Sequence, residues 1–222
     1  MVMEREYGPA KMRRFLRYEL DRYLSGRAGE RVEELPLERV EEQPYVHYSK
    51  GGLALYALKD QIGEEALNAA LRRYVRSVRF QPPPYTVSRE LLAFVAEATP
   101  PERRPLLDDL FRSIVLFDNR AEAAVARPLG DGRWEVRLRV RTRKLRADGK
   151  GVEAEAPLDD WIDVGVFGRD GAPLSLRKHH ATEPELELTL VVDERPLRAG
   201  VDPYNKPIDC VPGDNVRAVD AP

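Results

Sequence analysis

Tyr48 stands in a short segment, Tyr48-Ser49-Lys50-Gly51, whose residue types could take part in hydrolysis. Apolar residues at helical spacing, from Leu53 to Ile62, follow this segment directly. A phenol is a good hydrogen-bond donor, and a donor held at a helix start could face the oxyanion of a hydrolytic transition state. Tyr45 is the alternative if the register is shifted. The spacing alone favours a different interpretation, in which the tyrosine packs in the core beside a tight helix start.

The histidines do not follow a metal-site pattern. His179 and His180 are adjacent on a predicted strand, and successive strand side chains point to opposite faces. His47 has no partner at helical spacing. A catalytic zinc requires three protein ligands and a water molecule. The sequence therefore predicts no metal ligands and no cofactor-binding residues in this chain.

Two other features have ordinary interpretations. Cys210 lies far from any histidine in the sequence, which favours a buried structural cysteine over a nucleophile. The arginine row from Arg133 to Arg146 lacks the interleaved exposed aromatics of single-strand nucleic-acid binders, so we expect no nucleic-acid partner. We expect its charges to pair across the sheet with acids of later strands: Glu153, Glu155, Glu185 and Glu187.

The composition is that of an ordinary globular chain. Its 222 residues suit one or two domains, with 42% hydrophobic and 33% charged residues. The formal net charge of -2 gives no global attraction to nucleic acid or anionic lipid. One cysteine allows no internal disulfide. No stretch reaches the roughly 18 apolar residues of a membrane span, and no signal-peptide pattern opens the chain, so we expect the chain itself to be soluble.

The first half of the chain has helical periodicity. Apolar residues including Phe15 recur at three- and four-residue spacing over 12–24, and Glu64–Arg79 repeats the pattern with Val75 on its apolar face. Gly63 is a suitable C-cap. We read 26–44 as a connection. Two further helices are expected, one from Ser88 and one over 106–114.

The period changes near Phe117 from about 3.6 to 2. Over Trp134–Thr142 apolar residues alternate with charged ones, which predicts a strand with one buried face. Asp-Gly turn signals at 131–132, 148–151 and 170–171 separate further strands, expected near 152–156, 161–167, 174–180, 186–192 and 197–201. The sequence thus predicts a two-domain α+β fold: a helical part, 1–116, followed by an antiparallel, Ig-like β-sandwich, 117–222.

The order of several segments resembles the aminopeptidase N family of zinc aminopeptidases (gluzincins). The Tyr48–Gly51 segment is similar to the family's Tyr-x-Lys-Gly segment, and Leu55, Leu58, Gly63 and Tyr74 continue the likeness. Met3–Pro9 is similar to the segment that follows the last zinc ligand in bacterial members. Asp118-Asn119-Arg120 and Val201-Asp202-Pro203 are similar to parts of their small sandwich domain. This resemblance implies that Tyr48 stabilises the tetrahedral intermediate.

The same resemblance implies a longer parent enzyme. The family's His-Glu-x-x-His helix and downstream glutamate are not in this sequence, and Met1-Val2-Met3 is an unusually apolar start. We therefore expect a C-terminal portion, with 1–116 completing the catalytic domain and 117–222 forming the domain after it. Zinc would belong to the parent enzyme, and peptides would be its substrates. Bacterial relatives with permease-like spans suggest an inner-membrane parent with an extracytoplasmic peptidase domain.

Two further expectations concern the isolated chain. Without its missing N-terminal half it should be inactive, and apolar surface around Met1–Met3 and Tyr45–Leu58 should be exposed and favour self-association. The rival interpretation is a non-catalytic module, in which a helical platform and an Ig-like sandwich bind a protein partner.

Overall fold

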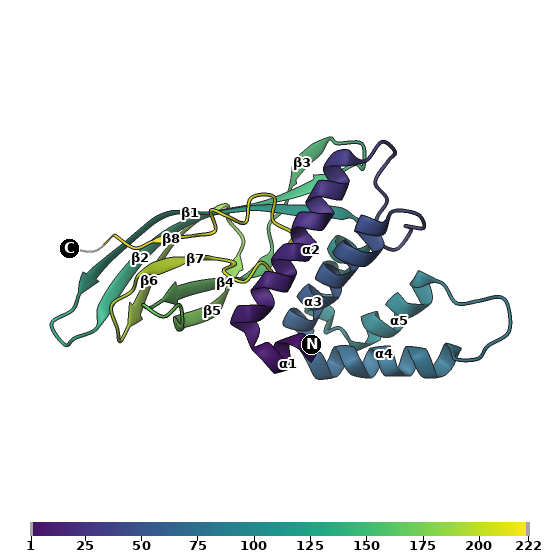
Figure 1. Cartoon of the computed structure of the whole chain (residues 1–222), viewed down its shortest axis with the longest axis horizontal. Helices are drawn as coiled ribbons and strands as arrows, with labels where there is room; N and C mark the ends of the chain where they lie inside the picture. The colour runs from purple at the N-terminus through teal and green to yellow at the C-terminus, as the bar shows by residue number, and fades with distance from the viewer. Residues whose placement is uncertain (1, 221–222) are drawn as a thin grey trace. The chain divides into compact units, whose positions relative to one another are not determined.

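The computed structural model describes residues 2–220, and the chain forms two compact units. The helical unit holds the chain up to Val115 together with Ala147–Glu153. The sandwich unit holds Leu116–Arg146 together with the chain from Ala154 onward. Helices precede strands along the chain (Figure 1), which confirms the predicted α+β class.

The helical unit is built from five main helices and several short turns. Gly8, with a φ of 79°, separates the first two helices, and Pro9 occupies the first turn of the second. Their bounds are α1 Val2–Tyr7, α2 Pro9–Gly29, α3 Gly51–Ile62, α4 Glu64–Val78 and α5 Ser88–Ala98; the π-helical turn η1, Tyr45–Lys50, precedes α3. The short turns η2 Pro101–Arg103, α6 Pro105–Leu107 and η3 Asp108–Arg112 complete the unit.

The core of the helical unit lies between α3, α4, α5 and the turns after α5. Figure 1 shows α4 and α5 side by side, joined by the proline-containing loop. Gly63 ends α3 as predicted, because its φ of 90° takes it out of the helix while its amide donates to the Lys59 carbonyl at 2.8 Å. The buried core residues are Ala54, Leu58, Leu67, Ala70, Leu92, Val95, Leu107 and Phe111.

Three expectations for this unit were wrong. The helix α2 continues through Gly26, where a connection was expected. Phe15 and Val75, expected on apolar faces, are 41% and 55% exposed. The expected helix over 106–114 is reduced to short turns, since β-branched residues at 114–115 favour an extended backbone and Ile114 opens β1.

The sandwich unit contains two four-stranded sheets. In the first, β2 Trp134–Ala147 lies between β1 Ile114–Pro128 on one edge and β3 Glu153–Ala156 and β6 Glu185–Val192 on the other. In the second, the order is β5 Pro173–Ala181, β4 Asp160–Phe167, β7 Arg198–Val201 and β8 Val216–Ala218. The β2–β6 and β4–β5 pairs are antiparallel. This arrangement confirms the sandwich-like half of the prediction.

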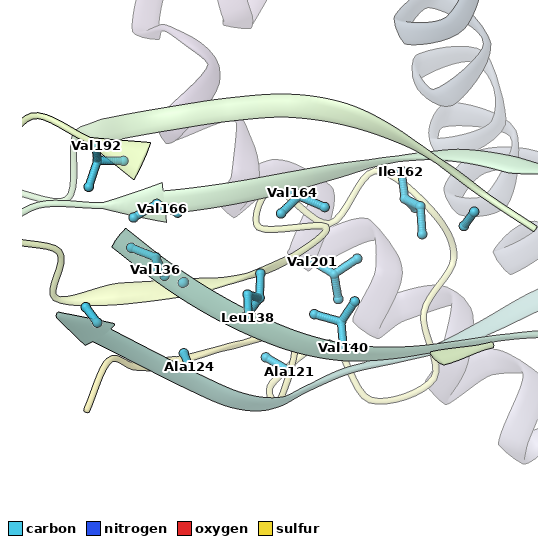
Figure 2. Close-up of a cluster of buried hydrophobic side chains, with 13 residues drawn as sticks. Ala121, Ala124, Val136, Leu138, Val140, Ile162, Val164, Val166, Val192 and Val201 are labelled. Atoms are coloured by element: carbon cyan, nitrogen blue, oxygen red, sulfur yellow. The ribbon is translucent and has the colours of Figure 1, made fainter. Parts of the chain in front are cut away.

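The inner faces of the two sheets meet in one apolar core (Figure 2). Val136, Leu138 and Val140 of β2 lie toward residues of the opposite sheet, including Val164 and Val201. These five side chains are at most 2% exposed. Charged residues occupy the alternate positions of β2, so the predicted two-residue period describes the strand correctly. Burial of these side chains is the main driving force for joining the sheets.

Glycines form the turns that the Asp-Gly signals predicted. Gly132, Gly149 and Gly171 have φ values of 87°, 85° and 77°, a region that glycine enters without steric cost. Gly132 lies between β1 and β2, and Gly171 lies between β4 and β5. The strands β1 and β8 were not predicted. No helix within residues 2–220 is both long and apolar enough to cross a bilayer.

Candidate functional site

The turn η1 carries the tyrosine that the sequence singled out. It is a single π-helical turn that runs into α3, and the Gly51 amide donates to the carbonyl of Val46, five residues back. Single π-helical turns are rare and often occur at functional sites, although η3 has the same π-helical geometry, so the geometry does not by itself distinguish η1. Val46, Ser49 and Lys50 are buried, whereas the side chain of Tyr48 is 71% exposed. The turn therefore presents one phenol to solvent from an otherwise packed backbone.

Tyr45, the register alternative, is a packing residue. Its ring stacks on that of Tyr23, with centroids 6.0 Å apart, and Gln43 Nε2 approaches its hydroxyl at 3.4 Å. It lies directly against Gly26 of α2, where an added Cβ would be 2.5 Å from the Tyr45 Cβ. Burial and the nearby Glu34 carboxylate raise the pKa of Tyr45. Of the two candidates, Tyr48 is the more exposed, whereas the half-buried Tyr45 is engaged in contacts within its own unit.

The expected apolar surface along Tyr45–Leu58 is not present. In this fully described stretch, the only large hydrophobic side chain that is exposed is that of Tyr48. Leu53, Ala54 and Leu58 are at most 1% exposed, because α3 packs against neighbouring helices of its own unit. Val2 and Met3 are 72% and 38% exposed, and Met1 lies outside the described residues.

Beneath the turn lies a group of three charged side chains and one tyrosine that we call the Glu34 cluster: Tyr23, Arg27, Glu34 and Lys50. Glu34 Oε1 accepts from the Tyr23 hydroxyl at 2.5 Å and lies 3.5 Å from Lys50 Nζ. Glu34 Oε2 accepts from Arg27 Nε at 2.8 Å. Glu34 is 4% and Lys50 1% exposed. One carboxylate thus joins α2 and η1 through three donors.

Burial sets the electrostatics of the Glu34 cluster. It lowers the pKa of Lys50, and the Glu34 carboxylate opposes part of this effect. Burial and the same carboxylate raise the pKa of Tyr23 far above its ordinary value, so that hydroxyl remains a donor. The second carboxylate partner of Arg27 is Glu153, at 2.9 Å from Nη1. Two cations and two carboxylates therefore balance in charge.

Sequence reasoning did not assign Lys50 or Glu34 a role of their own. One signal was present, since Lys50 precedes Leu53 and Ala54 by three and four residues and thus lies on the apolar face of the helix pattern. A charged residue on such a face requires a buried partner. Nothing local identifies Glu34 as that partner, because it lies 16 residues away in the connection before η1.

A cavity of about 320 Å³ opens beside the Glu34 cluster. Its lining carries charges of both signs and includes Arg27, Glu30, Arg31, Glu33, Glu34 and the turn Gly149–Gly151. The amide of Glu34 donates to the Gly149 carbonyl at 2.8 Å, which joins this turn to the helical unit. The mixed lining favours neither anions nor cations.

The candidate metal ligands are dispersed. His47 packs edge-on against Tyr48, with ring centroids 4.4 Å apart. His179 and His180 both lie on β5, and His180 stacks on Trp161 at 4.9 Å while its Nε2 lies 2.5 Å from Asp159 Oδ1. Across residues 2–220, no three histidine, cysteine, aspartate or glutamate side chains are grouped so that they could hold a metal ion.

The arginine row of β2 engages carboxylates of its own sheet. Arg143 pairs with Glu155 at 2.7 Å, as expected. Arg139 lies opposite Glu187 in the β2–β6 register but makes its ion pair with Glu122 of β1, at 3.2 Å. Cross-strand charge pairing is therefore correct for Glu155, whereas Glu153 pairs with Arg27 of α2 and the partners on β1 were not foreseen.

A second buried polar group holds the C-terminal segment of the sandwich unit. Asp209 accepts from the amides of Asn119 and Val211 at 3.2 and 2.8 Å and from Asn215 Nδ2 at 3.1 Å. Burial raises its pKa to about 6. The neighbouring Cys210 is half-buried, rather than buried as predicted, and its amide donates to the Phe117 carbonyl at 2.8 Å. These bonds join the segment after β7 to β1.

Comparison with known proteins gives no assignment: the sequence matches no family model, and no curated protein matches it.

Proposed function

We propose that this chain is the C-terminal part of a zinc-dependent aminopeptidase of the aminopeptidase N type, in which Tyr48 donates a hydrogen bond to the oxyanion of the tetrahedral intermediate. The observation that carries the proposal is the presentation of Tyr48. It is 71% exposed, whereas Val46, Ser49 and Lys50 of the same six-residue turn are at most 1% exposed. The resemblance of the Tyr48–Gly51 segment to the family's motif supports the same assignment.

The physical advantage of this arrangement is preorganisation. A donor already fixed in place stabilises developing charge without the cost of reorienting during the reaction. The backbone of Tyr48 is held by a turn that is continuous with α3. Its ring packs edge-on against His47, and its hydroxyl would donate to a substrate carbonyl brought within hydrogen-bond distance.

The residues of this chain do not fit a catalytic zinc site. The dispersed histidines do not provide three ligands, and no other ligand group is found within residues 2–220. In the proposed enzyme the zinc ligands and the water-activating glutamate would come from upstream sequence. The role assigned to the present chain is confined to the oxyanion donor and the scaffold that holds it.

The test is turnover of the longer protein that contains this chain. We expect Tyr48→Phe to lower the kcat for an aminoacyl amide by about 10²–10³-fold, the usual cost of one oxyanion donor, with the folded structure retained. Tyr85→Phe is the matched control, because Tyr85 is similarly exposed at 73% and lies in the loop between α4 and α5. Tyr45→Phe tests the other register.

Full turnover in Tyr48→Phe would contradict the proposal. If the longer protein also lacked a His-Glu-x-x-His helix upstream, the non-catalytic interaction module would become the better interpretation.

A further inference from the structure

The side chains that fix η1 point away from Tyr48. Residues two apart on a helical turn do not share a face, and Lys50 is 1% exposed where Tyr48 is 71% exposed. Lys50 therefore lies on the inner side of the turn while the phenol lies on the outer side. Any rotation of the turn that moved Tyr48 would also move the Lys50 ammonium.

Lys50 cannot move without breaking its contacts in the Glu34 cluster. Its Nζ lies 3.5 Å from Glu34 Oε1 and 5.3 Å from the centre of the Tyr23 ring. The carboxylate cannot follow such a movement freely, because the Tyr23 hydroxyl and Arg27 Nε hold it at 2.5 and 2.8 Å. Both of these donors belong to α2, so the Lys50–Glu34 pair links the position of η1 to that of α2.

An apolar side chain at position 50 could fill this space without the cost of desolvating a charge. Replacing a buried ion pair by apolar groups is often neutral or stabilising, whereas a pair can select one conformation over its neighbours. Stability alone therefore does not require a lysine at this position. Selection of one orientation of the turn is a role that such a pair can have.

We propose that the Lys50–Glu34 pair positions the phenol of Tyr48, so that Lys50 and Glu34 are positioning residues for the oxyanion donor. Neither residue needs to touch the substrate. The effect on turnover rests on the proposed function, while the effect on the turn does not.

The first experiment uses this chain alone. Lys50→Met together with Glu34→Gln removes both charges, leaves no unpaired buried charge and retains the Arg27–Glu153 ion pair. We expect amide hydrogen exchange at Tyr48 and Ser49 to become at least about tenfold faster, while exchange at Leu58 in α3 stays unchanged. The matched control is Lys144→Met with Asp160→Asn, an ion pair in the sandwich unit in which Lys144 is buried, Asp160 is half-buried and the two charged groups are 3.1 Å apart.

Unchanged exchange in η1, or equal acceleration throughout the helical unit, would overturn the inference. If the double variant does not fold, Tyr23→Phe removes one donor to Glu34 and keeps both charges. The same local acceleration, of smaller size, is then expected at Tyr48 and Ser49, and its absence would again overturn the inference.

The second experiment is a mutant cycle on turnover of the longer protein. We expect Lys50→Met/Glu34→Gln to lower kcat by at least about tenfold with little change in KM, since a displacement of about 1 Å can cost about 10²-fold. In the Tyr48→Phe background the same pair of changes should have no further effect on kcat. If the double change lowers kcat equally in both backgrounds, positioning is rejected. Positioning is also rejected if Tyr48→Phe lowers kcat but the double change alone does not. Full activity of Tyr48→Phe would instead reject the proposed function.

Discussion

At the scale of single residues, burial changes the behaviour of charged groups. Lys50 and Glu34 are the buried charged side chains among the described residues of the helical unit, and lysine and glutamate are almost never fully buried unless paired. In the sandwich unit, Asp202 and Asp209 are at most 1% exposed, and burial raises the pKa of both. Such groups link the stability of the fold to pH.

The pH dependence of stability can be worked out for Asp209. Its pKa in the folded chain is about 6, above the ordinary value of 3.8, so the folded state keeps a proton that the unfolded state has lost. The stabilising contribution is therefore complete below about pH 4 and is lost as the pH rises through about 6. This shift corresponds to about 3 kcal/mol in the free energy of unfolding.

We expect Asp209→Asn to flatten the decline in unfolding free energy between about pH 4 and pH 7 by up to that amount. Urea denaturation at several pH values measures the effect. Asp193→Asn is the control, because Asp193 is exposed at the end of β6 and should leave the decline as it is. A wild-type slope in Asp209→Asn would show that this carboxyl is already ionised at low pH.

At the scale of elements, the contacts on the inner side of η1 determine how its outer side, which carries Tyr48, is oriented. The turn η1 is fixed at its start by Tyr45 against Gly26 and at its end by Lys50 against Glu34. Both contacts are made with α2 or the connection that follows it. The long helix α2 thus orients the turn that carries Tyr48, although α2 contributes no residue to the proposed chemistry.

At Gly26 we expect alanine to destabilise the fold, which is opposite to the usual effect of replacing a helical glycine. Glycine to alanine inside a helix normally stabilises it by about 1 kcal/mol. At Gly26 an added methyl group would lie 2.5 Å from Tyr45, so we expect Gly26→Ala to lower the unfolding free energy by about 1–3 kcal/mol, as overpacking does.

The matched control is Gly29→Ala at the end of the same helix, where an added Cβ has no neighbour within 4 Å. It should be neutral or slightly stabilising in the same denaturation assay. Equal effects at both positions would mean that Tyr45 can move aside and does not fix the turn.

At the scale of the whole molecule, a segment with one clear period, such as β2, could be predicted from the sequence. Contacts between distant segments could not. The alternation over Trp134–Thr142 gave β2 because one face of that strand is buried throughout. The strand β1 was missed because it is rich in alanine and its buried positions change parity between Ala121 and Ala124. Alanine is a weak indicator of strand.

The candidate site shows the same division. The exposed position of Tyr48 lies on a segment that the sequence singled out. In the Glu34 cluster, Glu34 binds residues that lie 7 to 16 positions away from it, across a connection without periodicity. Only the packing of α2 against η1 brings those groups together, and no local pattern encodes that packing.

The chain as a whole also gives a prediction about metal binding. We expect the protein purified without a histidine tag to contain far less than one zinc per chain and to show no chelator-sensitive hydrolysis of aminoacyl amides, because its histidines are dispersed. Metal analysis and an amide-hydrolysis assay check both points. Stoichiometric zinc together with chelator-sensitive activity would show that the chain carries a complete site of its own.

The turn Ala147–Glu153 has a practical consequence for dissecting the protein. It follows β2 in the sequence, yet it belongs to the helical unit, where Gly149 accepts from the Glu34 amide and Glu153 pairs with Arg27. A helical fragment ending at Val115 would lack both partners. The Glu34 amide would then have to find another acceptor, and Arg27 would keep only one carboxylate. A single cleavage between helices and strands therefore does not yield an intact helical module, and exchanging one unit for another requires three junctions, after Val115, Arg146 and Glu153.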